Sequence, residues 1–279
     1  MKGIAKANIL KVKSAGKNEM EDYLVVEEPL EIRLAYQKEG IRHQKNIAVT
    51  MRTPGHDEEL ALGFLFTEGI ITDRSQVKSI ARTPVRWREA SENVIVAELA
   101  EGLEMNFKKL ERNFYTTSSC GVCGKASIEA VQVQGQYELP EKRPVFEAKI
   151  LHDLPGKLLQ NQSVFDCTGG LHGAALFDTA GRLLLSREDV GRHNALDKLI
   201  GTAFDQGALP LFDHLVLVSG RAGFELVQKS VVAGVPIMAA VGAPSSLAVK
   251  LAEDAGMTLI GFLRNGQFNI YAHPERVAL

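Results

Sequence analysis

Residues 215–263 read LVLVSGRAGFELVQKSVVAGVPIMAAVGAPSSLAVKLAEDAGMTLIGFL, and they set the architecture of the chain's second half. Three near-continuous apolar runs, 215–219, 236–241 and 258–263, alternate with segments long enough for helices. Continuous apolar runs are typical of parallel strands that are buried on both faces. The segment therefore predicts a βαβαβ unit and an α/β fold class.

Two joints in this unit lead from a strand into a helix and are rich in Gly and Ser. They are Ser219-Gly220-Arg221-Ala222-Gly223 and Gly242-Ala243-Pro244-Ser245-Ser246. Helix N-termini bind anions, and ligands of open parallel sheets bind outside the carboxyl ends of the strands. Arg221 and Arg264 fall at those ends, which favours a phosphate-bearing ligand; ordinary turn chemistry is the alternative. No Gly-x-Gly-x-x-Gly or Walker sequence is present.

The second half begins after Pro140, where two prolines among charged residues predict a domain boundary. We expect one domain over residues 1–140 and another over residues 141–279. Helices are predicted at 151–160 and 195–204, and a hairpin of two strands at 174–177 and 183–186. Cys167 lies in a short apolar stretch, where a small buried hydrophobe is the simplest interpretation.

The first half has the pattern of a small α+β unit. After a polar N-terminal arm, alternation predicts a strand at 30–36 and a second at 47–51. Acidic residues after His56 suit the start of a helix that ends at Gly69. Further strands are expected at 94–99 and near Phe107. His56 itself is either a structural residue at the helix start or a catalytic one.

Residues 115–125, YTTSSCGVCGK, hold two of the three cysteines of the 279-residue chain, Cys120 and Cys123. Gly and Ser/Thr neighbours predict a loop, and Lys125 favours the thiolate form. A structural zinc site is weakly supported because Cys167 is the only further cysteine. A thioredoxin-like redox pair, a persulfide carrier and two incidental cysteines remain open.

The composition excludes several classes of protein. The net charge is −2 without a basic run, which argues against nucleic-acid binding, and 45% of the residues are hydrophobic, enough for a sizeable core. No apolar run approaches membrane-spanning length, and the cysteine pattern does not suit a disulfide-stapled secreted fold. The sequence predicts a cytoplasmic protein that does not bind membranes. It leaves the oligomeric state open, and a homodimer is compatible with it.

Short motifs spread over most of the chain carry a resemblance to a known family. They are Glu58-Glu59-Leu60-Ala61-Leu62-Gly63-Phe64, Thr67-Glu68-Gly69, Ser118-Ser119-Cys120-Gly121-Val122-Cys123-Gly124, Thr168-Gly169-Gly170-Leu171-His172, Glu188-Asp189-Val190-Gly191-Arg192-His193-Asn194 and Ser219-Gly220-Arg221. With them the chain resembles the formate dehydrogenase accessory sulfurtransferases, the FdhD/NarQ family, from about residue 29 to residue 271. Gly223 stands where the family usually has a serine.

The resemblance implies a sulfurtransferase that takes persulfide sulfur from a cysteine desulfurase. The sulfur would pass to the molybdenum cofactor, in its bis(molybdopterin guanine dinucleotide) form, before that cofactor enters formate dehydrogenase. Cys120 would carry the persulfide, and Cys123 would release or exchange the sulfur. The implied cofactor-binding segment is Phe262, Leu263, Arg264, Asn265, Gly266 and Gln267. Further donors to the guanine nucleotide are expected from Ser219, Gly220, Arg221, Arg192, His193 and Asn194, with Arg192 alternatively paired to Glu188 or Asp189.

The resemblance also implies that residues 141–279 form a cytidine deaminase-like, three-layer α/β domain with a mostly parallel sheet. Zinc deaminases need a His or Cys with Glu two residues on, then Pro-Cys-x-x-Cys at the next helix. The corresponding helix starts read His193-Asn194-Ala195 and Ser219-Gly220-Arg221. We therefore expect no catalytic zinc and a cleft that is free for a nucleotide.

Two other functions compete with the sulfur carrier. A thiol–disulfide oxidoreductase would use the same cysteine pair without a nucleotide cleft. A non-catalytic chaperone of the molybdenum cofactor would bind nucleotide and partner with incidental cysteines. Guanine nucleotide binding separates the carrier from the oxidoreductase, and a Cys120→Ala variant separates it from the chaperone.

Overall fold

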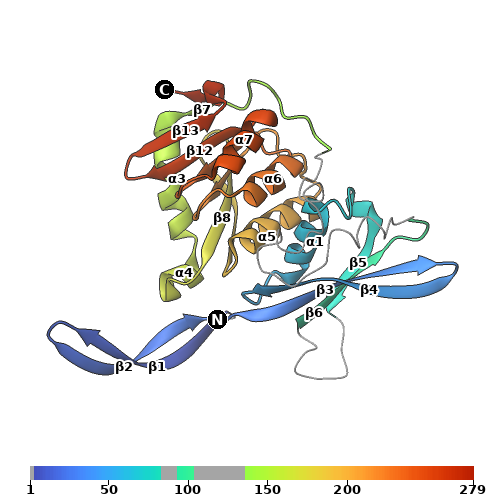
Figure 1. Cartoon of the computed structure of the whole chain (residues 1–279), viewed down its shortest axis with the longest axis horizontal. Coiled ribbons are helices and arrows are strands. Elements are labelled where there is room, and N and C mark those ends of the chain that lie inside the picture. The colour runs from blue at the N-terminus through green and yellow to red at the C-terminus, as the bar shows by residue number, and fades with distance from the viewer. Residues whose placement is uncertain (1–2, 83–92, 104–135) are drawn as a thin grey trace.

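The computed structural model describes residues 3–82, 93–103 and 136–279 of the chain. Cys120, Cys123 and the strand predicted near Phe107 lie outside the described residues. Two larger sheets organise these residues, one of four strands in the first half and one of six strands in the second (Figure 1). No helix in the described ranges is long and apolar enough to cross a membrane.

The six-stranded sheet has the order β13-β12-β11-β10-β8-β9. Its inner strands β10 (Leu215–Val218), β11 (Ile237–Ala240) and β12 (Thr258–Arg264) pair in parallel. Helices α6 (Phe224–Val232) and α7 (Ser246–Asp254) connect them. The predicted βαβαβ unit is therefore confirmed.

Antiparallel strands extend this sheet on both sides. The predicted hairpin is present as β8 (His172–Phe177) and β9 (Leu183–Asp189), and β8 pairs antiparallel with β10. At the other edge β13 (Gln267–Ala272) folds back on β12. Parallel pairing is thus limited to the inner strands. The outermost pairs, β8–β9 and β12–β13, are each joined by a short turn that reverses the chain direction.

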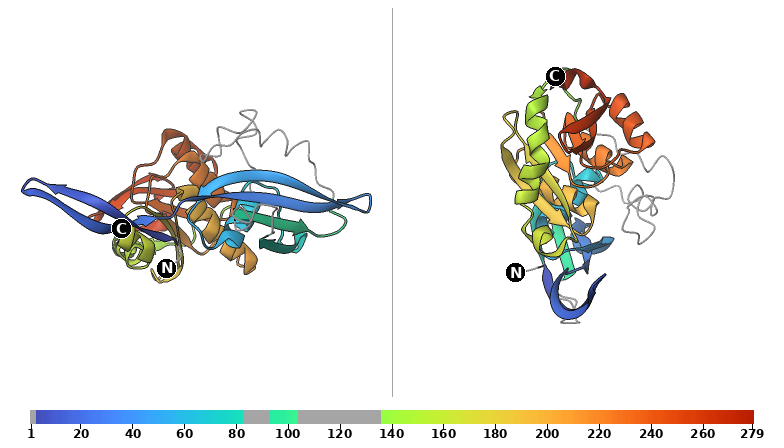
Figure 2. Two further views of the ribbon diagram at one scale, coloured as in Figure 1. Left: turned by 90° about the horizontal axis from the view of Figure 1, so that it is seen from below. Right: turned by 90° about the vertical axis from the view of Figure 1, so that its left-hand side faces the viewer.

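Helices cover both faces of the sheet and give three layers. Alternate residues of a strand face opposite sides, so Val216 packs in one core cluster with α5 (Arg192–Asp205) and α6. Its neighbour Leu217 packs in a second cluster with α3 (Ala148–Gln160). Figure 2, right, shows α3 on one side of the sheet and the red and orange helices on the other.

Short elements complete the second half. After α3 the chain forms α4 (Ser163–Thr168), and near the C-terminus a 3-10 turn (Pro274–Arg276) leads into β14 (Val277–Ala278), which pairs with β7 (Phe146–Glu147). The expectation that Cys167 is buried is wrong, because this residue lies on the exposed side of the short helix α4.

The first half forms a sheet of order β4-β3-β6-β5 backed by α1. The predicted strands are β3 (Glu28–Lys38), β4 (Ile41–Arg52) and β6 (Val94–Leu99). A 3-10 turn (Arg74–Gln76) leads into the edge strand β5 (Val77–Arg82). Helix α1 (Asp57–Thr67) begins and ends where the acidic start and Gly69 predict.

The polar N-terminal arm forms a β-hairpin. Strands β1 (Ile4–Lys13) and β2 (Gly16–Val25) pair over their whole length and extend away from the rest of the molecule (Figures 1 and 2). Apolar and charged residues are mixed in these strands without a buried face, and even the apolar Val12 is 72% exposed.

The two halves share one hydrophobic cluster. Leu30 and Leu60 of the first half belong to the same cluster as Leu199 and Leu226 of the second. Helices α1 and α5 form the main contact between the halves, as Figure 1 shows at the centre of the molecule. The domain boundary near residue 140 stays a prediction.

Candidate functional site

The carboxyl ends of β10, β11 and β12 bring the predicted joints together. The N–H of Gly242 donates to the carbonyl of Gly220 at 2.9 Å, and the N–H of Phe262 donates to the carbonyl of Gly242 at 3.0 Å. The two joints also meet where the N–H of Ala222 donates to the carbonyl of Ala243 at 3.1 Å. The edge that sequence reasoning selected is therefore one continuous surface.

Glycine is required where these joints approach each other. A Cβ atom on Gly242 would lie 2.9 Å from the carbonyl oxygen of Gly220. A Cβ atom on Gly220 would lie 3.3 Å from Nδ1 of His172, a neighbour on β8. Glycine at these two positions therefore lets the two joints and the His172 side chain lie close together.

Arg192 and His193 lie at the start of α5, beside the same edge. His193 Nε2 lies 2.9 Å from Glu225 Oε2 in the first turn of α6, so the two helix starts are tied together. Within the described ranges neither Arg192 nor Arg221 forms an ion pair with a carboxylate. The alternative pairing of Arg192 with Glu188 or Asp189 is thus absent from this part of the chain.

Two predicted site residues are structural instead. Asn194 is 8% exposed, and its amide nitrogen donates to the carbonyl of Met51 at 2.7 Å and to Asp189 Oδ1 at 3.1 Å. Leu263 is 1% exposed and packs against the α3 side of the sheet. Neither side chain reaches the edge. Strand alternation turns Leu263 inward, and Asn194 is held by its hydrogen bonds at the junction between the halves.

The segment from Phe262 to Gln267 ends β12 and turns into β13. Phe262 has a φ of 53°, which is rare for a bulky residue, and its ring lies 5.7 Å from Arg264 Cζ. Arg264, Asn265, Gly266 and Gln267 are exposed at the turn. A half-buried aromatic ring covered on one side by a guanidinium is a suitable platform for a stacked base.

His172 joins this site although sequence reasoning did not select it. Burial lowers the pKa of His172, and the nearby charges of Arg192 and His193 lower it further. The imidazole is therefore neutral at neutral pH. His172 is the first residue of β8, and its place beside the carboxyl end of β10 becomes visible only from the order of the strands in the sheet.

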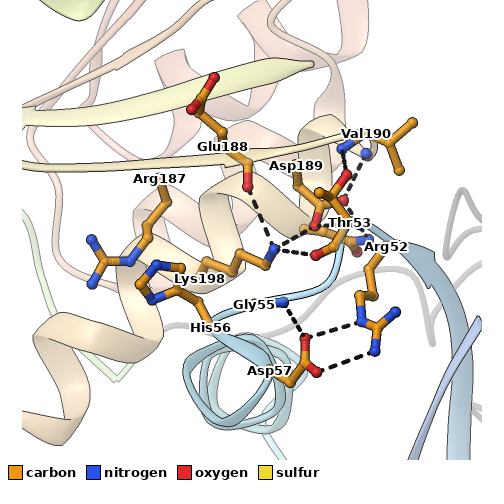
Figure 3. A network of polar contacts seen from close by, with 12 residues as sticks. Arg52, Thr53, Gly55, His56, Asp57, Arg187, Glu188, Asp189, Val190 and Lys198 are labelled. Carbon is orange, nitrogen blue, oxygen red and sulfur yellow. Dashed lines mark hydrogen bonds and ion pairs between the residues drawn. The ribbon is translucent and has the colours of Figure 1, made fainter. Parts of the chain in front are cut away.

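A buried polar network joins the two halves (Figure 3). Lys198 Nζ lies 2.7 Å from Asp189 Oδ2 and donates to the carbonyl of Thr53 at 2.9 Å. Nearby, Arg52 forms a two-point ion pair with Asp57 at 3.0 and 3.2 Å. These side chains are 0–3% exposed, except Thr53 at 5%, so they hold the junction rather than bind a ligand.

His56 belongs to this junction as well. Its Nδ1 lies 3.1 Å from Glu59 Oε2, and Arg187 donates to both oxygens of the same carboxylate at 2.5 and 2.9 Å. Burial raises the pKa of Glu59, but the hydrogen bonds from His56 and Arg187 outweigh it and lower the pKa to about 2. The geometry supports the structural interpretation of His56.

Metal-binding geometry is missing from the described part of the chain. Within residues 3–82, 93–103 and 136–279, no three His, Cys, Asp or Glu side chains gather as a metal site would require. The expectation of no catalytic zinc stays a prediction.

Comparison with known proteins places the chain in a family. The sequence profile of the FdhD/NarQ family matches residues 25–278. The sulfur carrier protein FdhD of Streptomyces avermitilis is 48% identical over 97% of this chain and 94% of its own. The proteins of the same name from Mycolicibacterium paratuberculosis (91% of both chains) and Sulfolobus acidocaldarius (99% of both chains) are 52% and 43% identical.

The fold is similar to a solved structure too. A formate dehydrogenase accessory protein from Desulfotalea psychrophila superposes with a TM-score of 0.76 at 24% identity, covering 99% of this chain and 100% of that one. At this identity the likeness concerns the fold alone. Together with the profile match and the relatives, whose identity extends over nearly the whole chain, it leads to one conclusion: this chain belongs to the FdhD/NarQ family.

Proposed function

We propose that this chain is a sulfur carrier that serves the maturation of formate dehydrogenase. The observation that carries the proposal is the 43–52% identity to sulfur carrier proteins over 91–99% of the chain. The sequence adds a Cys-x-x-Cys pair at Cys120 and Cys123, the residue type that sulfur carriage needs.

The first chemical step loads Cys120. Its thiolate attacks the outer sulfur of a persulfide on a cysteine desulfurase, and the donor cysteine leaves as a thiolate. One S–S bond breaks and one forms, so no external oxidant or reductant is needed. Lys125 supports the thiolate form through its positive charge.

The second step releases the sulfur. The thiolate of Cys123 attacks the inner sulfur of the Cys120 persulfide, which forms a Cys120–Cys123 disulfide and expels hydrosulfide. The two cysteines supply the two electrons that reduce the outer sulfur, and a thiol reductant restores the pair. Hydrosulfide can then replace an oxygen ligand of the molybdenum, which we regard as the substrate.

The carboxyl edge of β10–β12 is the proposed place for the guanine nucleotide of that substrate. Arg192 and Arg221 stand there without a carboxylate partner within the described residues, next to the N-termini of α5 and α6. Helix N-termini and guanidinium groups both attract phosphate oxygens. Phe262 supplies the stacking surface for a base.

Mass spectrometry of the intact protein tests the carrier role. After incubation with a cysteine desulfurase and cysteine, wild-type protein is expected to gain about one sulfur, which a thiol reductant removes. Cys120→Ala should lose this gain. Cys167→Ala is the matched control, because Cys167 is also exposed and could react nonspecifically. Equal sulfur uptake by Cys120→Ala and wild type would contradict the proposal.

Client activation separates a carrier from a chaperone. Cys120→Ala that binds guanosine diphosphate normally but leaves formate dehydrogenase inactive supports the carrier. A variant that still activates the client fully would show that the cysteine is incidental.

A further inference from the structure

The N-terminal arm, formed by β1 and β2, has no hydrophobic core of its own. It is a sheet of two strands, and no residue from 4 to 24 belongs to a hydrophobic core cluster of the described residues. Figures 1 and 2 show the arm extending away from the two halves. Isolated two-stranded hairpins are only marginally stable in water, so two strands of ten residues each favour a partner that covers one face. The arm also precedes residues 25–278, the region that the family profile matches.

The register of the arm divides its side chains into two faces. Residues directly opposite each other in an antiparallel pair point to the same side, and the next pair along the strands points to the other side. A Cβ atom on Gly170 would lie 3.0 Å from Cγ1 of Val25, so the face of Val25, which we call the inner face, is turned towards the body of the molecule at its base. The opposite face, which we call the outer face, consists of Ala5, Ala7, Ile9, Lys11, Lys13, Gly16, Asn18, Met20, Asp22 and Leu24.

Charged and apolar side chains follow a regular order along the outer face. Its centre is apolar, because Ile9 lies opposite Met20, which is 43% exposed. Asp22 follows two residues nearer the base of the arm, and Lys11 follows two residues nearer its tip. Within the described residues neither of these two side chains forms an ion pair, whereas the Lys6–Glu21 pair at 2.7 Å belongs to the inner face. The outer face therefore carries opposite charges at equal distances from an exposed apolar centre.

We propose that the outer face of the arm binds the outer face of a second copy of this chain, with the two arms antiparallel. A twofold axis between the two arms then brings Ile9 and Met20 against the same residues of the other copy. Because the contact is isologous, Lys11 of each copy comes to the level of Asp22 of the other copy. The contact removes exposed apolar surface from water and gives each of these charges a partner.

The order of charges on the outer face favours a second copy over other partners. A face with opposite charges at equal distances from an apolar centre is complementary to itself under a twofold rotation. A surface that binds anionic lipids or an acidic protein needs positive charge alone, and Asp22 would oppose such binding. An unrelated partner protein does not require this symmetry. The self-complementary order is therefore the observation that identifies the occupant.

Sedimentation equilibrium of the full chain tests the inference. Wild type should change from monomer to dimer between about 1 and 100 µM, the range expected for an interface below the standard size. Met20→Asp should weaken the dimer by more than about 100-fold, because it places two carboxylates against each other in the apolar centre. Val12→Asp is the matched control, since Val12 is 72% exposed on the inner face of the same arm and should associate as wild type does. Circular dichroism should show unchanged unfolding midpoints for both variants, because neither residue packs in a core cluster of the described residues.

Charge reversal tests the antiparallel alignment of the two arms. Lys11→Glu and Asp22→Lys each place two pairs of like charges across the interface, so each homodimer should be roughly tenfold weaker than wild type. A mixture of the two variants has opposite charges at both contacts and should form a heterodimer about as tightly as wild type associates. Lys38→Glu reverses an exposed lysine of β3, outside the arm, and should have no effect.

Three results would overturn the inference. The first is a wild-type chain that stays monomeric over the whole concentration range. The second is a dimer that Met20→Asp and Val12→Asp weaken equally, or that neither variant weakens, because the contact would then lie elsewhere. The third is a mixture of Lys11→Glu and Asp22→Lys that associates no better than either variant alone. A monomeric wild type whose sulfur uptake from a cysteine desulfurase is lost in Met20→Asp would assign the outer face to the sulfur donor instead.

Discussion

Gly63 of α1 and Gly201 of α5 lie directly against each other where the two helices cross. A Cβ atom on Gly63 would stand 2.9 Å from the backbone nitrogen of Gly201 and 1.9 Å from the carbonyl oxygen of Asp197. A Cβ atom on Gly201 would stand 1.9 Å from the carbonyl oxygen of Glu59. The backbones of the two halves are therefore in contact where α1 crosses α5.

Gly63→Ala and Gly201→Ala are each expected to destabilise the protein by about 3 kcal/mol or more, because the new methyl group meets backbone atoms that cannot rotate away. Urea unfolding followed by circular dichroism measures the change. Gly156→Ala is the matched control: it replaces a helical glycine with no atom within 4 Å and should be neutral or stabilising. Equal midpoints for all three variants would contradict the close contact.

Lys229 is a second stability test. It is 6% exposed, and its Nζ lies 3.0 Å from both oxygens of Asp197 and 2.8 Å from Thr67 Oγ1. Burial lowers the pKa of Lys229, but the carboxylates of Asp197 and Glu68 outweigh it and raise the pKa. Burial also raises the pKa of Asp197, and the charge and hydrogen bond of Lys229 together with the hydrogen bond from Thr67 oppose that rise.

Lys229→Met should cost about 3–5 kcal/mol of unfolding free energy at neutral pH, since it leaves the carboxylate of Asp197 buried and unpaired. Adding Asp197→Leu to the Lys229→Met variant should restore part of the lost unfolding free energy. Lys6→Met, which breaks the exposed Lys6–Glu21 pair, is the control and should change stability by less than about 1 kcal/mol. Similar losses for both lysine variants would show that burial of the pair is unimportant.

The lowered pKa of Glu59 predicts that the stability of the protein depends on pH. Its pKa is lowered from 4.5 to about 2 in the folded chain, through a balance of burial and the hydrogen bonds from His56 and Arg187. A depressed pKa contributes stability above the unfolded value, and that stability is lost as the pH falls through the folded value. The relevant window therefore lies between about pH 4.5 and pH 2.

Glu59→Gln should be less stable than wild type by about 2 kcal/mol at pH 6, after allowance for partial exposure of the carboxylate. The difference should close as the pH approaches 2, which unfolding at a series of pH values measures. Glu58→Gln alters an exposed neighbour in the same turn and should follow wild type. A gap that is independent of pH would contradict the assigned titration.

Local sequence signals were sufficient for the elements around the site. The apolar runs predicted β10, β11 and β12 within two residues of their bounds. The Gly/Ser joints predicted the edge of the sheet at which the ends of these strands come together. The turn residues from Asp178 to Gly181 predicted the hairpin of β8 and β9. These predictions depend on periodicity and on turn chemistry, which act within a few residues of the chain.

Features that depend on contacts between distant residues were not predictable in this way. Gly63 and Gly201 are 138 residues apart, and only their packing explains either one. Asn194 follows Arg192 and His193 in one polar run, yet it bonds to Met51 of the other half. Gln162 carries no motif, and its close packing against Gly173 becomes visible only in the folded chain.

Zinc content tests the expected loss of deaminase chemistry. His193 has its Nε2 at 2.9 Å from Glu225 rather than among thiolates, and the paired cysteines of the deaminase motif are absent from the sequence at Ser219-Gly220-Arg221. Elemental analysis should find far less than one zinc per chain. Stoichiometric zinc that survives mild chelation and disappears in His193→Ala would contradict this expectation.

Arg221 distinguishes the phosphate site from the base site. Its exposed guanidinium lies at the joint before α6, so Arg221→Ala should remove one charged hydrogen bond to phosphate, about 1.5–3 kcal/mol. Guanosine diphosphate should therefore bind roughly 10- to 100-fold more weakly, while guanosine should be unaffected because it has no phosphate. Calorimetry with both ligands measures the difference.

Two further variants complete that experiment. Phe262→Ala removes the stacking ring and should weaken both ligands to the same extent, by about 1–3 kcal/mol. Lys250→Ala changes an exposed cation of α7 and should leave both affinities unchanged. Because phosphate contacts are screened by salt, the Arg221 effect should also shrink as ionic strength rises. Unchanged affinities in both Arg221→Ala and Phe262→Ala would place the nucleotide away from this edge of the sheet.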